Sequence, residues 1–169
     1  MNNSNTTSDL TDLPNRSGID HEKPGYKQTK LGWIPEDWEV RKLGQLGAFL
    51  KGSGISKSEL KSKGLPAIRY GEIYTLHDYY IKEFYSFIDE ETAKKSKKLE
   101  YGDLLFTCSG ETRVDIGKCV AFIDTKEAYA SGDIAILRGV KEDAKFLGFL
   151  LNDSIINHQR FKIAQGHSV

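Results

Sequence analysis

Residues 102–113 have the sequence GDLLFTCSGETR. Residues 103–107 form a short apolar run beside a glycine, which predicts a buried β-strand. The residues after this run are polar, so the strand delivers a polar loop. Contact groups on a loop held by a rigid strand are a common way to build a binding surface. We therefore predict a binding loop whose candidate contact residues are Ser109, Glu111, Arg113 and Lys118.

Short strands and glycine-bounded turns continue on both sides of this segment. Further strands are predicted over residues 38–43, 46–50, 65–70, 73–75, 118–123 and 133–137. A surface helix is predicted over 89–98, which is acidic first and basic last, as the helix dipole favours. Residues 143–165 have helical apolar spacing with a break at 152–154. These elements predict an α+β fold, with a mixed or antiparallel sheet and peripheral helices.

The length of 169 residues predicts one domain, over residues 26–169, preceded by a disordered polar tail over 1–25. Residues 1–12 lack the apolar core of a secretory signal, and no apolar run approaches a membrane span. Cys108 and Cys119 have no metal-ligand spacing, so we expect two reduced core thiols, no metal site and a cytoplasmic location.

The formal net charge is zero, but residues 41–63 hold six basic residues against one acidic residue. Such a stretch can meet phosphate, although a solvated surface face is the plain alternative. Within it, Gly52 and Gly54 would let backbone amides approach a phosphate, and Lys51 and Ser53 are the candidate contacts. An ordinary tight turn is the alternative. Ser56 is expected to cap a short helix that ends at Gly64.

A second polar cluster, IRYGEIYT, covers residues 68–75. Arg69 could bind a guanine edge, Glu72 could accept from cytosine N4, and Tyr70 could bond phosphate. The alternative is a bulged strand with half-buried tyrosines. Near the end of the chain, Gln165 and His167 follow a helix and are further candidates for DNA contact, unless they belong to a frayed chain end.

Catalytic patterns are weak in this sequence. Ser109 lies in Cys-Ser-Gly and not in the nucleophile pattern Gly-x-Ser-x-Gly, and no histidine is suitably placed. Asp133 with Asp143 and Lys145 superficially matches a magnesium-dependent nuclease. Asp143 is better explained as a helix cap, so we expect no catalytic centre and keep the nuclease only as an alternative.

With these segments in place, the chain resembles the specificity subunit of type I restriction–modification systems. The resemblance covers residues 26–169 and rests on several segments in combination. They are KLGWIPEDWEV at 30–40, IRYGEIY at 68–74, GDLLF at 102–106, SGET at 109–112, GDI at 132–134 and AQGHSV at 164–169.

The resemblance implies a non-catalytic subunit with two target-recognition domains, separated by long helical spacers, each binding one half of a split DNA site. It also implies methyltransferase (M) subunits and a restriction (R) subunit as partners. S-adenosylmethionine, ATP and Mg²⁺ would belong to those partners, so no cofactor is expected in this chain.

The sequence departs from the family pattern because it stops where a strand, a proline-rich turn and the spacer helix would follow. It therefore resembles a single N-terminal recognition domain, and a second half-specificity chain is a further candidate partner. We predict binding to double-stranded DNA through two polar loops. The alternative is a protein-interaction module that modulates the methyltransferase or a full specificity subunit without tight DNA binding, which the neutral charge and missing spacer would suit.

Overall fold

The computed structural model describes residues 23–163. Most of the tail predicted over 1–25 lies outside this range, as do Gln165 and His167. The chain divides into two compact units with a boundary between Glu39 and Val40. This boundary falls inside the region that we predicted as one domain, and each unit is described by itself.

The first unit contains a β-hairpin. Strand β1 (Tyr26–Thr29) pairs antiparallel with β2 (Gly32–Pro35). The Thr29 hydroxyl donates to the carbonyl of Gly32 at 2.9 Å and accepts from the Leu31 amide at 3.1 Å. These bonds fix the turn, in which Gly32 has a φ of +100° that favours glycine.

The strand predicted over 38–43 is wrong. Residues 38–42 are exposed and pair in none of the ladders of the described chain, and the 3-10 helix η1 (Leu43–Gln45) follows them. The alternation of apolar and charged residues is present, but it meets no neighbouring strand that would bury its apolar side.

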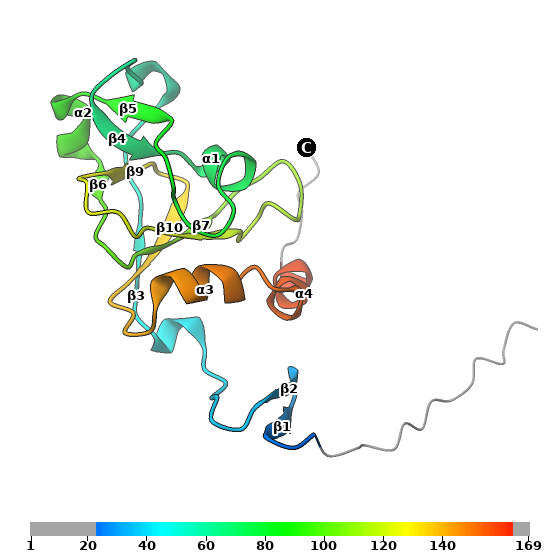
Figure 1. The fold of residues 1–169 in the computed structure, drawn as a ribbon. Helices are drawn as coiled ribbons and strands as arrows, with labels where there is room; N and C mark the ends of the chain where they lie inside the picture. The colour runs from blue at the N-terminus through cyan, green and yellow to red at the C-terminus, as the bar shows by residue number, and fades with distance from the viewer. Residues whose placement is uncertain (1–22, 164–169) are drawn as a thin grey trace, which may run out of the picture. The chain divides into compact units, whose positions relative to one another are not determined.

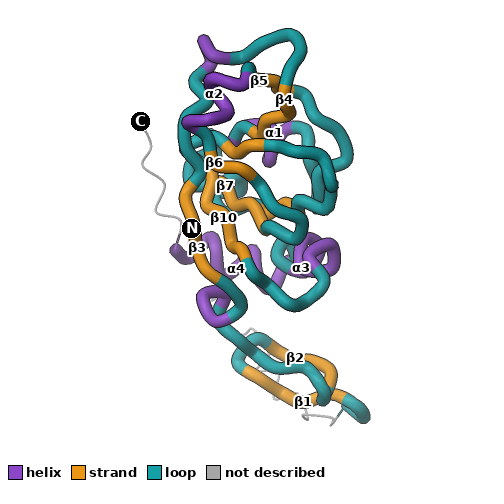
Figure 2. The backbone as a smooth tube through the Cα atoms, turned by 90° about the vertical axis from the view of Figure 1, so that its left-hand side faces the viewer, coloured by secondary structure: helices purple, strands orange, loops and turns teal. Residues whose placement is uncertain are grey.

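The central sheet of the second unit has the strand order β3-β10-β7-β8, and every pairing in it is antiparallel. Its strands are β3 (Ala48–Lys51), β7 (Leu104–Thr107), β8 (Cys119–Ala121) and β10 (Ile134–Arg138). Strands β3, β10 and β7 lie side by side in Figure 2. The strands predicted over 46–50, 103–107, 118–123 and 133–137 are thereby confirmed.

A second sheet has the order β5-β4-β9-β6, with β4 and β9 parallel and its other pairs antiparallel. Its strands are β4 (Leu65–Ile68), β5 (Ser86–Ile88), β6 (Lys97–Lys98) and β9 (Tyr129–Ala130). The mixed α+β class predicted from the sequence is confirmed. The strand predicted over 73–75 is wrong, because helix α1 (Tyr70–Thr75) occupies that segment.

Four further helical segments were expected from capping residues, charge order or apolar spacing. Ser56 and Glu59 form a capping box at the 3-10 helix η2 (Lys57–Glu59), which ends well before Gly64. The other helices are α2 (Glu90–Lys95), α3 (Ala144–Leu150) and α4 (Ser154–Ile163), so the break near 152–154 is confirmed. None of the helices in the described chain combines the length and the apolarity that a membrane span requires.

The core occupies both faces of the central sheet. Leu105 and Ile136 point to one face and pack with Ile73 of α1, whereas Leu104 and Leu137 point to the other and pack with Leu147 of α3. Figure 1 accordingly shows α1 and α3 on opposite sides of that sheet. The two-residue alternation of each strand therefore determines which helix it meets.

The cap of α2 predicts a pH-dependent contribution to stability. Asp89 accepts from the Thr92 amide at 2.9 Å, and this bond is the main cause that lowers the pKa of Asp89 to about 2. A carboxylate whose folded pKa is depressed stabilises the fold above its unfolded pKa and loses this effect as pH falls through the folded value.

We therefore expect the melting temperature of the wild type to approach that of Asp89→Asn between about pH 4 and pH 2. Thermal unfolding of both proteins over this range measures the difference. If the difference in melting temperature between the two proteins stayed the same across the acid range, the lowered pKa of Asp89 would be contradicted.

Candidate functional site

The loops that carry the predicted contact residues emerge at one edge of the central sheet. In the ladders of β10, Ile134 pairs with Thr107 and Ala135 pairs with Lys51. The end of β3, the end of β7 and the start of β10 therefore meet there. The parallel pairing of Ile68 with Ala130 brings the end of β4 beside the end of β9. Segments that are far apart in sequence thus form one surface.

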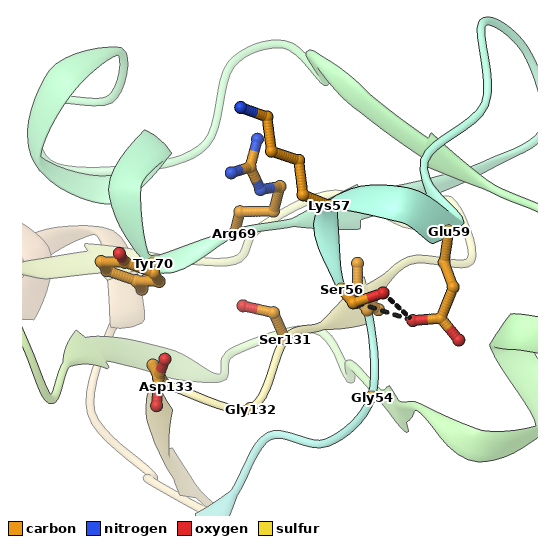
Figure 3. Close-up of a pocket in the computed structure, with 10 residues that line it drawn as sticks. Gly54, Ser56, Lys57, Glu59, Arg69, Tyr70, Ser131, Gly132 and Asp133 are labelled. Carbon is orange, nitrogen blue, oxygen red and sulfur yellow. Dashed lines mark hydrogen bonds between the residues drawn. The ribbon is translucent and has the colours of Figure 1, made fainter.

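An open pocket of about 500 Å³ lies within this surface. It is lined by residues 54–57 and Glu59, by Arg69 and Tyr70, and by residues 131–133, as Figure 3 shows. The structure therefore brings Arg69 and Tyr70 next to the end of the glycine loop. The sequence analysis missed Ser131 as a residue of the pocket, because it belongs to no recognised motif.

The glycine loop has a packing role that differs from the predicted one. The Gly52 amide donates to the carbonyl of Ile134 at 2.9 Å, and the Ser53 amide donates to that of Ala130 at 3.2 Å. A Cβ on Gly52 would lie 1.9 Å from the carbonyl oxygen of Ser131. These two amides are occupied, so they are not available to a phosphate.

The phosphate contact predicted for Ser53 is likewise corrected, because its hydroxyl donates to the carbonyl of Lys95 at 3.0 Å. Lys51 is exposed at the end of β3, which is an edge strand of the central sheet. Its side chain can reach solvent at the same sheet edge as the pocket, so we keep Lys51 as a candidate contact.

Glu72 is a structural residue, which corrects its prediction as a base contact. Its side chain is 7% exposed. One carboxylate oxygen accepts from the Arg69 amide at 3.1 Å, and the other accepts from the Ser86 hydroxyl. Glu72 thereby caps α1 and ties it to β5, while the side chains of Arg69 and Tyr70 line the pocket.

The loop over residues 108–117 presents Ser109, Glu111 and Arg113 to solvent. Asp115 holds its conformation, because one of its carboxylate oxygens accepts from both the amide and the hydroxyl of Thr112 at 2.8 Å. The pKa of Tyr74 on α1 is raised by burial and, to a lesser extent, by the Glu111 carboxylate. Ile73 of α1 packs with Leu105 of β7, the strand that leads into the loop, so the two predicted polar clusters are neighbours.

Lys118 is half-buried, and its ammonium donates to the carbonyl of His77 at 2.7 Å. Burial lowers the pKa of Lys118, and this contact joins the loop after α1 to β8. This contact gives Lys118 a structural role, so we do not retain it among the candidate DNA contacts.

The cysteines differ from the predicted pair of core thiols. Cys119 is buried, and burial raises the pKa of its thiol, whereas Cys108 is exposed. Among residues 23–163 no group of three or more His, Cys, Asp or Glu side chains is arranged to hold a metal ion.

The geometry does not support the nuclease alternative. Asp133 precedes β10 and Asp143 follows it, so the five residues of the strand, at about 3.3 Å each, separate them. Asp143 accepts from the Phe146 amide at 2.6 Å and caps α3, as the sequence predicts. The ammonium of Lys145 lies 4.6 Å from the centre of the Tyr80 ring, away from Asp133. One Mg²⁺ cannot join these groups.

The chain is similar to proteins of known kind. No family model matches the chain. It is 24% identical over 155 residues to the type I restriction enzyme MjaVIII specificity subunit of Methanocaldococcus jannaschii, an alignment that covers 86% of this chain and 35% of that protein.

Among solved structures, the HsdS subunit from Thermoanaerobacter tengcongensis matches with a TM-score of 0.50 and 16% identity, over 90% of this chain and 33% of that one. A structure of a type I R-M system, determined in a study of its assembly and conformational transition, has a TM-score of 0.44 and 18% identity, over 81% of this chain and 30% of that one.

The chain is thus similar in sequence to a type I specificity subunit and shares its mixed α+β fold with an HsdS subunit. The resemblance and the fold class predicted from the sequence are both confirmed. Similarity to a specificity subunit also supports the prediction of a non-catalytic chain. The chain spans about a third of the length of these relatives.

Proposed function

We propose that this chain is a cytoplasmic, sequence-specific DNA-binding module that reads one half of a split site for a type I restriction–modification system. The observation that carries the proposal is the convergence of two polar segments at one sheet edge. The exposed loop over 108–117 follows β7, against which α1 packs, and α1 begins at the pocket that Arg69 and Tyr70 line.

The loop is suited to base readout because its backbone is held while its long side chains are free to reach a groove. Asp115 and Thr112 fix the turn, and Glu111 and Arg113 extend from it into solvent. An arginine fork recognises guanine through two hydrogen bonds, and a carboxylate accepts from cytosine N4. The residues that we retain as candidate DNA contacts are Lys51, Arg69, Tyr70, Ser109, Glu111 and Arg113.

The proposed partners are duplex DNA, the methyltransferase (M) subunits and the restriction (R) subunit, together with a second half-specificity chain. In this proposal the module supplies sequence recognition, and partner subunits carry S-adenosylmethionine, ATP and Mg²⁺. Its full test is a selection of bound sequences from a random duplex pool, with and without methyltransferase. Enrichment of one half-site is expected, and a pool left unchanged under both conditions would contradict the proposal.

Arg113→Ala is expected to weaken binding to the selected duplex by about 1–3 kcal/mol while leaving non-specific binding nearly unchanged, because one base contact is lost. Competition gel shifts with selected and scrambled duplexes measure both quantities. Arg41→Ala is the matched control, since Arg41 pairs with Glu142 beyond the opposite end of β10. Equal losses on the two duplexes would instead assign Arg113 to a phosphate.

A second candidate function, protein interaction, is favoured by an aromatic patch on α3 and the loop after α1. Tyr79 stacks on Phe149 at 4.4 Å between ring centres, and these residues are 40% and 45% exposed. Apolar patches of this kind occur at protein interfaces. Binding to a methyltransferase through it would change little with salt, whereas DNA binding weakens steeply as salt rises. A pull-down without DNA, repeated at two salt concentrations, separates the two functions.

A further inference from the structure

The pocket at the sheet edge contains a buried hydroxyl that lacks a partner. Ser131 is 5% exposed, and its Oγ makes no hydrogen bond within the described chain, although its amide donates to the carbonyl of Ile68 at 3.0 Å. Figure 3 shows the hydroxyl pointing into the space bounded by Arg69, Tyr70 and Asp133. Because buried polar groups in proteins are ordinarily hydrogen-bonded, this hydroxyl is available to a polar group that enters the pocket.

Two cations line the same pocket. Lys57 and Arg69 extend from one side of it in Figure 3, and within residues 23–163 neither charged end has an ion-pair partner. Two nearby lysines do have carboxylate partners, because Lys61 lies 3.3 Å from Asp89 and Lys95 lies 4.0 Å from Glu59. No carboxylate of the described chain neutralises these two cations, so the charge at the pocket favours an anion.

The acidic residues of the pocket do not cancel its preference for an anion. Glu59 is engaged by the amide and the hydroxyl of Ser56, each at 2.7 Å, and these bonds lower its pKa. Asp133 is exposed and lies on the far side of the pocket from Lys57 and Arg69 in Figure 3. An anion seated against the two cations is thus kept away from the free carboxylate.

We propose that this pocket holds one phosphodiester group of the bound DNA backbone, an inference that rests on the proposed function. Arg69 and Lys57 contact the non-bridging oxygens, and the Ser131 hydroxyl donates to one of them at the floor of the pocket. The volume of about 500 Å³ lies in the range of small-ligand sites, so it accommodates a sugar–phosphate unit. Such a contact fixes the position of the module on the duplex while the loop over 108–117 reads the bases.

Three variants of the full chain test the site by gel shift against the selected and a scrambled duplex. Arg69→Gln and Lys57→Gln are each expected to weaken binding to both duplexes about equally, by about tenfold for Arg69→Gln. Because the two cations share one phosphodiester, each single variant should reduce the slope of log K against log salt concentration by less than about 0.9, the value for one neutralised phosphate, and the double variant should reduce it by about 0.9. Lys141→Gln is the matched control, because Lys141 is exposed beyond the opposite end of β10, and it should change neither quantity.

Ser131→Ala separates a ligand contact from a structural role. It is expected to weaken binding to both duplexes about threefold. Its urea midpoint of unfolding should be unchanged or higher, because no hydrogen bond within the protein is lost. A lower midpoint with normal DNA affinity would assign the hydroxyl to the fold and overturn its part in the site.

The outcomes distinguish this inference from the proposed function. If the wild type prefers its selected duplex and Arg69→Gln binds like the wild type, the phosphodiester site is wrong and the proposed function stands. A change in preference between duplexes would also overturn it, because Arg69 would then contact a base. If the wild type shows no preference but Arg69→Gln still lowers affinity and salt slope, the proposed function fails and the site stands.

A free phosphate compound could offer the same chemistry. Titration of the wild type with inorganic phosphate and with a deoxynucleoside monophosphate, followed by NMR, tests this source. Weak binding, in the millimolar range or above, is expected for both. Tight mononucleotide binding that Arg69→Gln abolishes, with DNA affinity unaltered, would overturn the DNA assignment in favour of a nucleotide site.

Discussion

Asp103→Ala is expected to lower the free energy of unfolding by about 3 kcal/mol, because it removes the buried carboxylate of Arg138 and leaves only the exposed carboxylate of Glu100, 2.6 Å from the guanidinium, as its ion-pair partner. Asp103 is 1% exposed and accepts from Nε and Nη2 of Arg138 at 2.9 and 2.7 Å. It also accepts from the Glu100 amide at 2.8 Å. Urea unfolding followed by circular dichroism measures the loss.

The arginine cannot escape this cost by losing its proton. The hydrogen bond from Arg138 to Asp103 raises the already high pKa of the guanidinium, so it is charged throughout the accessible pH range. A double variant that also carries Arg138→Met should recover most of the loss, since no buried charge is then left unpaired. If the double variant lost as much free energy of unfolding as the two single variants together, this coupling would be contradicted.

An exposed ion pair provides the control. Asp78 is 70% exposed and lies 3.6 Å from the ammonium of Lys82. Surface pairs of this kind contribute about 0–1 kcal/mol, so Asp78→Ala should change the free energy of unfolding far less than Asp103→Ala. The comparison shows that burial and bidentate geometry, and not the mere presence of a carboxylate, determine the effect.

The sequence predicted those elements whose residues carry their own signal. The apolar strands β7, β8 and β10 were found, α2 was found from its acidic start and basic end, and Asp143 was found because a cap lies next to the helix that it starts. Strand β9 was missed, because two residues have no measurable periodicity and only pairing with β4 and β6 makes them a strand. Helix α1 was missed because arginine is an unusual N-cap residue, so its capping box with Glu72 had no familiar pattern.

The site was predictable only where exposure follows from local sequence. Arg113 and Glu111 lie in a polar loop and are exposed, as expected. Glu72 looked equally polar but is buried, and nothing in its neighbours marks Ser86, fourteen residues away, as its partner. Ser131 lies beside Arg69 only because β4 and β9 pair in parallel, which is a tertiary contact that no local pattern encodes.

Gly52→Ala is expected to lower the free energy of unfolding by about 3 kcal/mol, because a Cβ at this position would lie 1.9 Å from the carbonyl oxygen of Ser131. The overlap involves backbone on both sides, so it is relieved only by moving β3 away from the segment after β9. The bonds from the Gly52 and Ser53 amides to Ile134 and Ala130 would then lengthen or break. Urea unfolding measures the loss, and Gly44→Ala is the control, since nothing lies within 4 Å of its Cβ position.

The same variant decides between the two explanations of the glycine loop. If Gly52 existed to let a phosphate approach the backbone, alanine would leave stability nearly unchanged and weaken DNA binding in low salt. If Gly52 exists because two chain segments touch, alanine destabilises the protein first. DNA affinity then falls because the pocket between Lys57 and Ser131 is distorted. A stable Gly52→Ala protein with impaired DNA binding would therefore restore the phosphate role and contradict the close packing seen at this sheet edge.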